Sequence, residues 1–194
     1  MVDLEQIHGI LKERLRESRY VHSLGVQKTA VELAKRYHAP VEKASIAGLV
    51  HDCAKGYNKA ELLNYAAQFG IILDNVTRKQ EELLHAVVGA ELAKREFQIE
   101  DEEILNAIRF HTTGRANMTL LDKIIYLADY IEPNRKFQGV EALRQQALSD
   151  LDKATFMAVN QTIAYIIFQN KLIHHDTISA RNSLLMDLEG LRQE

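Results

Sequence analysis

Residues 44–58 read Ala44-Ser45-Ile46-Ala47-Gly48-Leu49-Val50-His51-Asp52-Cys53-Ala54-Lys55-Gly56-Tyr57-Asn58, and this stretch combines a helical pattern with a candidate metal-binding doublet. Residues 44–53 are apolar and periodic, whereas residues 55–58 break the pattern, so we expect a helix to end near His51-Asp52. Adjacent helical side chains point about 100° apart, but at a helix end the backbone can turn and let both reach one metal ion. Alone, however, a His-Asp pair is more often a surface polar pair.

Helical periodicity continues on both sides of this stretch, without strand alternation or a hairpin signal. Leu4, Ile7, Leu11 and Leu15, for example, repeat at spacings of three and four. We therefore expect a single all-α domain over residues 1–194, with about nine or ten helices. The expected helices cover about residues 4–15, 20–38, 40–53, 58–69, 104–111, 120–132 and 150–167, with a loop at 134–139. Two more are expected: one of about 18 residues after the capping-box spacing of Thr77–Gln80, and a last one capped by Thr177. Asn58 would cap and Gly70 would end the helix at 58–69, and Asp150 would begin the one at 150–167.

Composition excludes several classes of protein. The 24 basic and 27 acidic residues give a net charge of −3, without the basic bias of a nucleic-acid surface. No run approaches the roughly 20 apolar residues of a membrane-spanning helix, and the acidic N-terminus does not resemble a signal peptide. The one cysteine, Cys53, cannot form an internal disulfide; we expect a small core residue there and a cytoplasmic protein.

Further histidines and a carboxylate supply candidate partners for the doublet. Asp129 lies inside the apolar segment 124–131, where an unpaired buried charge would be costly, so it must be paired, hydrogen-bonded or bound to metal. His22 lies upstream, and His85 and His111 lie on apolar-rich helices. Each alone is more often an ordinary polar residue, but the ordered set is unlikely to be accidental. The remaining histidines, His8, His38, His174 and His175, are interpreted mainly as surface residues, with His174 or His175 near a ligand.

This order resembles the HD superfamily of metal-dependent phosphohydrolases, in which a histidine, a His-Asp doublet and a distant aspartate lie on a helical core. The longer motif blocks resemble the YqeK family of bacterial HD proteins and cover nearly the whole chain. The resemblance implies a single HD-domain helical bundle that splits diadenosine tetraphosphate into two ADP with bound iron. The implied metal ligands are His22, His51, Asp52 and Asp129. The matching blocks are Tyr20–Val26, His51–Gly56, His85–Ala90, Ile108–Gly114, Lys123–Arg135 and Thr177–Asn182.

Two relatives within the superfamily fit less well. The guanosine-tetraphosphate hydrolases carry acidic residues where this chain has Lys55-Gly56, and the cyclic-dinucleotide phosphodiesterases carry a Gly-Tyr-Pro signature. Here Gly56-Tyr57 is followed by Asn58, so that signature is incomplete.

Two imidazoles and two carboxylates suit iron, manganese or cobalt, with positions left for water and a phosphate oxygen. Asp52 or Asp129 would orient the nucleophile, and cations would neutralise the polyphosphate, since the chain has no Gly-rich phosphate loop. His85 and His111 would contact phosphate or hold a second metal, of which we favour the first. The residues predicted to be catalytic are Asp52, Asp129 and Lys55; those predicted to bind substrate are Lys55, Gly56, Tyr57, His85, His111, Thr112, Arg135, Ile173, His174, Thr177 and Arg181, with Phe137 a further candidate for adenine.

Three functions therefore remain open. The main hypothesis is symmetrical hydrolysis of a dinucleotide. The alternatives are an HD nucleotidase acting on mononucleotides and a non-catalytic nucleotide- or metal-sensing module. Apolar positions on many helices also leave room for a homodimer interface.

Overall fold

The computed structural model describes residues 3–191, and every regular element in that range is a helix, which confirms the predicted all-α fold. One apolar cluster contains side chains from α1 to α11, for example Ile7 and Leu184. Eleven helices occur in the described range, against nine or ten expected. They are α1 (Leu4–Arg14), α2 (Glu17–Arg36), α3 (Val41–Val50), α4 (Lys59–Gln68), α5 (Asn75–Lys79), α6 (Glu81–Glu96), α7 (Glu102–Phe110), α8 (Leu120–Ile131), α9 (Val140–Ser149), α10 (Leu151–Phe168) and α11 (His175–Leu188).

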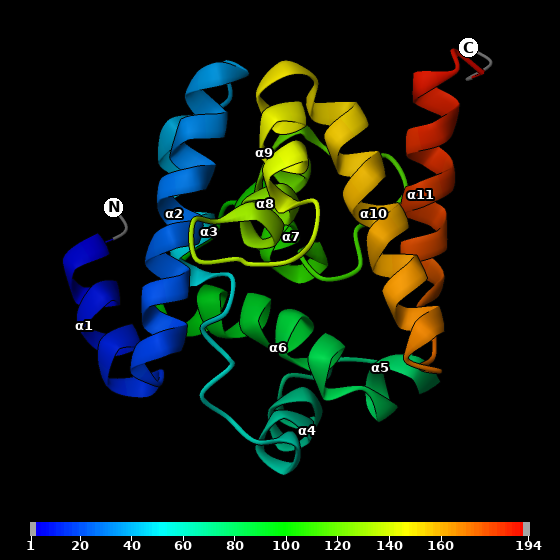
Figure 1. Cartoon of the computed structure of the whole chain (residues 1–194). Helices are drawn as coiled ribbons and strands as arrows, with labels where there is room; N and C mark the ends of the chain where they lie inside the picture. The colour runs from blue at the N-terminus through cyan, green and yellow to red at the C-terminus, as the bar shows by residue number, and fades with distance from the viewer. Residues whose placement is uncertain (1–2, 192–194) are drawn as a thin grey trace.

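Helix α8 is the central element, surrounded by α2, α3, α7, α9 and α10 (Figure 1). Eight of its twelve residues are buried, and Ile124, Ile125 and Leu127 are completely buried. So wide an apolar surface needs neighbours on several sides to cover it. A capping box between Thr119 and Asp122 begins the helix. Because α8 lies in the middle, its last turn reaches the place where α2 and α3 meet.

Helices α2 and α3 pack closely, and a glycine permits the contact. A Cβ atom at Gly48 would lie 2.9 Å from the Cα atom of Gln27, so a larger residue would push the helices apart. The approach brings the C-terminal end of α3, with His51 and Asp52 beyond it, up to His22 on α2.

The remaining helices form the outer walls of the molecule. Helices α10 and α11 run side by side, with α10 against α8, while α4 and α5 lie against α6 (Figure 1). No helix within residues 3–191 has the combined length and apolar character that crossing a membrane requires. The prediction of one domain over residues 1–194 includes both chain ends, which lie outside the described residues, and it stays a prediction.

Two predicted helix caps are right and two are wrong. Asn58 caps α4 in a capping box with Glu61, and Asp150 caps α10. Thr77, by contrast, lies within the short helix α5 and donates its hydroxyl to Asp74, which is the actual cap. Likewise Thr177 lies inside α11, because the ring of His174 caps that helix three residues earlier. The last helix thus begins sooner than expected. The long helix expected after Thr77 is α6, which begins later, at Glu81, and has no side-chain cap.

Two helices were missing from the sequence prediction. Helix α5 has only five residues, too few for a periodic pattern. Helix α9 does carry such a pattern in Val140, Leu143 and Ala147, all buried, directly after the predicted loop. Gly139, at φ 91°, makes the turn into it.

Candidate metal centre

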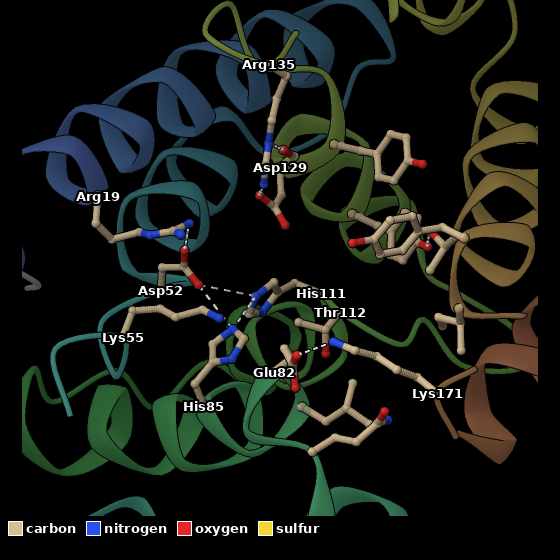
Figure 2. A pocket seen from close by; sticks show the side chains of 17 residues that line it. Arg19, Asp52, Lys55, Glu82, His85, His111, Thr112, Asp129, Arg135 and Lys171 are labelled. Atoms are coloured by element: carbon tan, nitrogen blue, oxygen red, sulfur yellow. Dashed lines mark hydrogen bonds and ion pairs between the residues drawn. The ribbon is translucent and has the colours of Figure 1, made fainter. Parts of the chain in front are cut away.

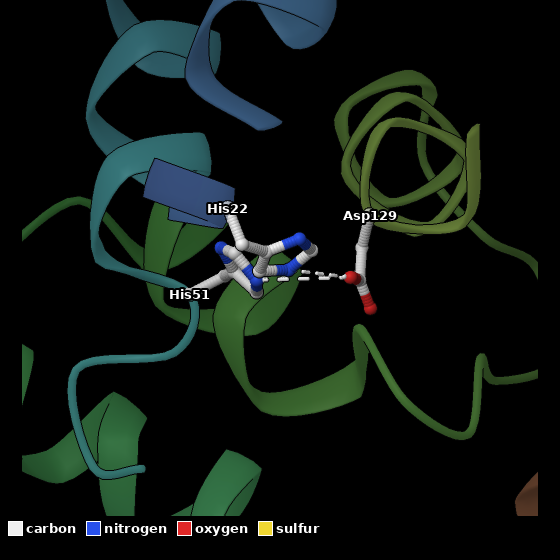
Figure 3. Close-up of side chains that lie close together, drawn as sticks. All are labelled: His22, His51 and Asp129. Atoms are coloured by element: carbon white, nitrogen blue, oxygen red, sulfur yellow. Dashed lines mark ion pairs between the residues drawn. The ribbon is translucent and has the colours of Figure 1, made fainter. Parts of the chain in front are cut away.

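Six side chains from five separate parts of the chain converge beside the last turn of α8. His22 comes from α2, Asp129 from α8, and His51 and Asp52 from the turn that follows α3. Figure 3 shows His22, His51 and Asp129 pointing toward one another. Single donor atoms of these three residues lie within 4.8 Å of each other, close enough for one ion. His85 on α6 and His111 after α7 complete the group.

The doublet lies where helix α3 ends, as predicted. His51 is the C-cap of α3, and the backbone then continues in a turn instead of a helix. Consequently both side chains face inward, with His51 Nε2 only 3.4 Å from Asp52 Oδ2. Cys53, the next residue, points elsewhere and donates its thiol to the carbonyl of Gly89.

Nδ1 of His85 is buried without a hydrogen-bond partner among the described residues. The same holds for two ring nitrogens that face the aspartates, Nε2 of His22 and Nε2 of His51. Asp129 Oδ1 lies 3.0 Å from the His22 nitrogen, but not in the direction of an N–H bond. A buried polar atom without a partner is costly. Paired with two nearby carboxylates, these nitrogens fit a bound metal ion.

In His51 and His111 the opposite ring nitrogen contacts a backbone carbonyl, which fixes these two rings in place. Nδ1 of His51 lies 2.8 Å from the carbonyl oxygen of Gly48, and Nδ1 of His111 lies 2.7 Å from that of Ile108. Since a carbonyl only accepts, both rings carry a proton on Nδ1. In the neutral form of each ring, Nε2 then presents a lone pair to the centre.

Asp52 lies between His51 on one side and the pair His85 and His111 on the other. Its Oδ1 atom lies 3.1 Å from Nε2 of His85 and 3.6 Å from Nε2 of His111. The two histidine Nε2 atoms are 3.1 Å apart. Asp52 is almost fully buried, whereas the carboxylate of Asp129 is about 20% exposed toward the cleft, less buried than its apolar segment suggested.

Burial and opposite charge set the ionisation of these groups. Burial alone would raise the pKa of Asp52, but the imidazoles of His51, His111 and His85 hold it well below its usual range. Burial also opposes ionisation of Asp129, where His22, His51 and Arg135 together lower the pKa. Both aspartates are therefore charged at neutral pH. Burial lowers the pKa of His85 to about 4, so that ring is neutral.

A cleft with a volume of about 320 Å³ opens from the two aspartates, and four cations border it, three of them beside the aspartates (Figure 2). Arg19 donates to Asp52 at 2.9 Å. Arg135 donates to the carboxylate of Asp129 at 2.5 Å and to its backbone carbonyl at 2.8 Å. Lys55 also borders the cleft, and burial lowers its pKa.

The far wall of the cleft is aromatic and apolar. It is formed by Tyr126 and Tyr130 from α8 and by Tyr165 and Ile166 from α10. At the mouth, Lys171 reaches across to Glu82 at 2.6 Å (Figure 2). One end of the cleft is thus charged and the other suits a flat apolar group.

Several predicted site residues do border this cleft: Asp52, Lys55, His85, His111, Thr112, Asp129 and Arg135. Others lie elsewhere. Tyr57 packs its ring edge-on against Tyr65, and Gly56 lies against the backbone of Arg14. Phe137 contacts Tyr130 from the outside. Ile173, His174, Thr177 and Arg181 are also absent from the lining of the cleft, so their substrate contacts stay predictions.

His174 was interpreted mainly as a surface residue and is in fact buried. Together with His175 and Asp176 it has donor atoms close enough for an ion. However, its Nε2 already pairs with Asp74 and its Nδ1 accepts from the backbone of Asp176. Arg181 lies over the ring of Phe156, away from the centre.

Sequence reasoning missed Arg19 and the aromatic wall. Arg19 precedes His22 by three residues, hence it lies on the same face of α2, and that spacing could have revealed it. Tyr126 stands three residues before Asp129 in the same way. Tyr165 gave no such signal, because α10 is apolar along much of its length.

Comparison with known proteins adds independent findings. A family model described as HD domain matches residues 19–134. The chain is 46% identical over 178 residues to a protein of Halalkalibacterium halodurans named "Bis(5'-nucleosyl)-tetraphosphatase, symmetrical", covering 92% of this chain and 95% of that one. A Bacillus subtilis protein of the same name is 43% identical, covering 93% and 97%.

A solved structure is similar along nearly the whole chain. It is described as a predicted HD superfamily hydrolase involved in NAD metabolism from Clostridium acetobutylicum. The TM-score is 0.93 at 48% sequence identity, with 96% of this chain and 99% of that one covered.

Proposed function

The chain belongs to the HD domain family, and from this premise we propose that it is a hydrolase that cleaves dinucleoside tetraphosphates symmetrically. The relatives of that name match it over more than nine-tenths of their length. One observation carries the chemical part of the proposal. Two buried imidazole nitrogens without partners face two charged carboxylates at the closed end of a cation-bordered cleft.

We propose His22, His51, Asp52 and Asp129 as the metal ligands. Two imidazoles and two carboxylates suit iron, and also manganese or cobalt. The ion, when bound, acts as a Lewis acid that polarises a phosphoryl oxygen and makes water more acidic. Because hydrolysis needs a nucleophile in line with the bond that breaks, Asp52 or Asp129 also orients the attacking water.

The cations beside the aspartates position the polyphosphate and neutralise its charge. Catalysis of phosphoryl transfer is largely positioning and charge neutralisation. Arg135 is held rigidly by its two hydrogen bonds to Asp129, so its guanidinium is already oriented toward the cleft. Lys55 and Arg19 border the same end of the cleft.

His85 and His111 are proposed to contact phosphate. His85 is neutral at physiological pH, so it can present a ring N–H to a phosphate oxygen. The hydroxyl of Thr112 is buried without a hydrogen-bond partner among the described residues and adds a second donor. A second metal ion between Asp52, His85 and His111 is the alternative use of this cluster, because the facing donor atoms of these three residues lie 3.1 to 3.6 Å from one another.

The nucleoside would occupy the aromatic end of the cleft. Tyr165 is 60% exposed and free to stack on a base, whereas Tyr126 is buried with its hydroxyl next to Thr162. A cleft of about 320 Å³ lies at the small end of the range for ligand pockets. It can therefore enclose one end of the substrate, while the rest extends past Lys171 into solvent.

The decisive experiment is a product assay on metal-analysed protein. With diadenosine tetraphosphate we expect ADP as the only nucleotide product, two molecules for each substrate consumed. Formation of AMP and ATP would contradict symmetrical cleavage. Release of nucleoside and phosphate from mononucleotides, without activity on the dinucleotide, would support the nucleotidase alternative, and binding without turnover would support the non-catalytic one. The cytoplasmic location and the homodimer remain predictions.

A further inference from the structure

Glu132 is a buried acid at the metal centre that none of the roles above uses. It follows the last residue of α8, and only 2% of it is exposed. Its Oε1 atom lies 3.1 Å from Nδ1 of His22, on the side of the ring away from the cluster. Its Oε2 atom accepts hydrogen bonds from the backbone nitrogen of Asn134 at 2.7 Å and from the side-chain nitrogen of Asn134 at 3.1 Å.

The contact decides which nitrogen of His22 can bind metal. An ionised carboxylate only accepts hydrogen bonds, so the proton of the ring must sit on Nδ1 and the lone pair on Nε2. We infer that Glu132 is the positioning residue of the metal centre, which fixes the orientation and the tautomer of His22. The inference rests on the proposed metal site. His51 and His111 are oriented by neutral carbonyl groups instead. Of the groups that contact Nδ1 of these three histidines, Glu132 is thus the carboxylate, and a carboxylate partner raises the basicity of the histidine as a metal ligand.

A neighbouring arginine holds the turn that carries Glu132. Arg144 on α9 donates Nε to the carbonyl of Ile131 at 2.8 Å, and Nη2 to the carbonyls of Glu132 at 2.7 Å and Arg135 at 3.0 Å. The same turn presents Arg135 to Asp129. One guanidinium therefore fixes the backbone on which the partners of two proposed ligands depend.

Gly25 leaves the space that Glu132 occupies. It lies three residues after His22 on α2, and a Cβ atom there would stand 2.5 Å from Oε2 of Glu132. That oxygen is the end of a flexible side chain, so Glu132 would swing away and lose its contacts. Gly25→Ala should thus disturb the metal centre without changing any charge or any proposed ligand.

The test is the affinity of the metal-free protein for Co²⁺, measured by competition with a chelator, together with the visible spectrum of the bound ion. For Glu132→Ala we expect an affinity about 10- to 100-fold below that of the wild type and an altered spectrum, since partners of metal ligands typically have effects of this size. Glu132→Gln keeps the shape and an acceptor, so its loss should be smaller. Asp122→Asn is the matched control: it alters another buried carboxylate, which caps α8 and pairs with Arg115, and should leave Co²⁺ affinity unchanged.

The double variant separates positioning from general damage. Gly25→Ala should lower Co²⁺ affinity in the wild type but have no further effect in Glu132→Ala, where nothing remains to be displaced. Wild-type affinity in Glu132→Ala, or an equal loss from Gly25→Ala in both backgrounds, would overturn the inference. Wild-type protein that binds Co²⁺ but makes no ADP would instead overturn the proposed reaction, and the affinities would still decide the role of Glu132.

Discussion

Replacing Arg135 with alanine should slow hydrolysis of diadenosine tetraphosphate while leaving the metal in place. The guanidinium borders the cleft and is held by two hydrogen bonds to Asp129. A phosphate chain bound beside Asp129 would meet a cation that is already oriented, so substrate binding does not have to order it. Asp129 keeps its contact with His22 when the arginine is removed.

The size of the effect follows from the exposure of the side chain. Hydrogen bonds to charged groups contribute about 1.5–3 kcal/mol each. Because 38% of the Arg135 side chain is exposed, water screens its charge, and we take about 2 kcal/mol for its contact with the transition state. At 1.36 kcal/mol for each factor of ten, kcat/KM should fall about 30-fold. Arg135→Lys keeps the charge but loses the two-nitrogen geometry, so a smaller loss is expected.

Steady-state rates of ADP formation at fixed metal concentration measure this loss directly. Lys136→Ala is the matched control, since it removes the neighbouring positive charge from an exposed position outside the cleft. It should change kcat/KM less than twofold. If Arg135→Ala contains the normal amount of metal and retains kcat/KM within threefold of the wild type, our account of phosphate neutralisation is wrong.

Three further outcomes are expected. Asp52→Ala should abolish both metal content and activity while far-UV circular dichroism stays largely unchanged; full activity would rule out the metal assignment. Tyr165→Ala should raise KM for the dinucleotide but leave inhibition by inorganic polyphosphate unaffected, because the ring faces the base; an equal effect on both would contradict the stacking role. Asp74→Asn should destabilise the protein at pH 7, measured by urea unfolding. Although burial opposes its ionisation, hydrogen bonds from Thr77 and His174 hold the pKa of Asp74 well below its usual value. Its stabilising contribution is therefore complete above about pH 4 and shrinks as the pH falls further; a difference as large at pH 2 as at pH 7 would refute this.

The local signals in the sequence were sufficient for most of the fold. Asn58, Gly70 and Pro133 mark helix ends that depend only on nearby backbone, and the structure has them there. Thr77 was a wrong prediction because Asp74 begins a separate short helix that contains Thr77, and the long helix follows only after Gln80. Helix α9 has helical spacing in Val140, Leu143 and Ala147, but its ten residues directly follow the predicted loop at 134–139 and carry a short pattern.

The structure brings together the residues predicted for the centre of the candidate site, but not all of those predicted for its edges. His22, His51, Asp52 and Asp129 have chemistry that makes their types informative even before their distances are known. Contacts of the substrate depend instead on which helix covers the cleft. The far wall comes from α10, whose position against α8 is a matter of long-range packing, so no local pattern could place Tyr165 there.

The residues that meet at this centre are far apart in sequence, so a bound ion would also affect the stability of the fold. His22 and Glu132 are 110 positions apart in sequence, and the proposed ligands close a loop of nearly that length. An ion that binds such distant segments together only in the native state stabilises that state by mass action, by about 2.7 kcal/mol when free metal is 100 times its dissociation constant. A shortage of metal would then lower the stability of the protein as well as its activity. It would shift chains toward states open to proteolysis, so the lifetime of this protein would follow the supply of its metal.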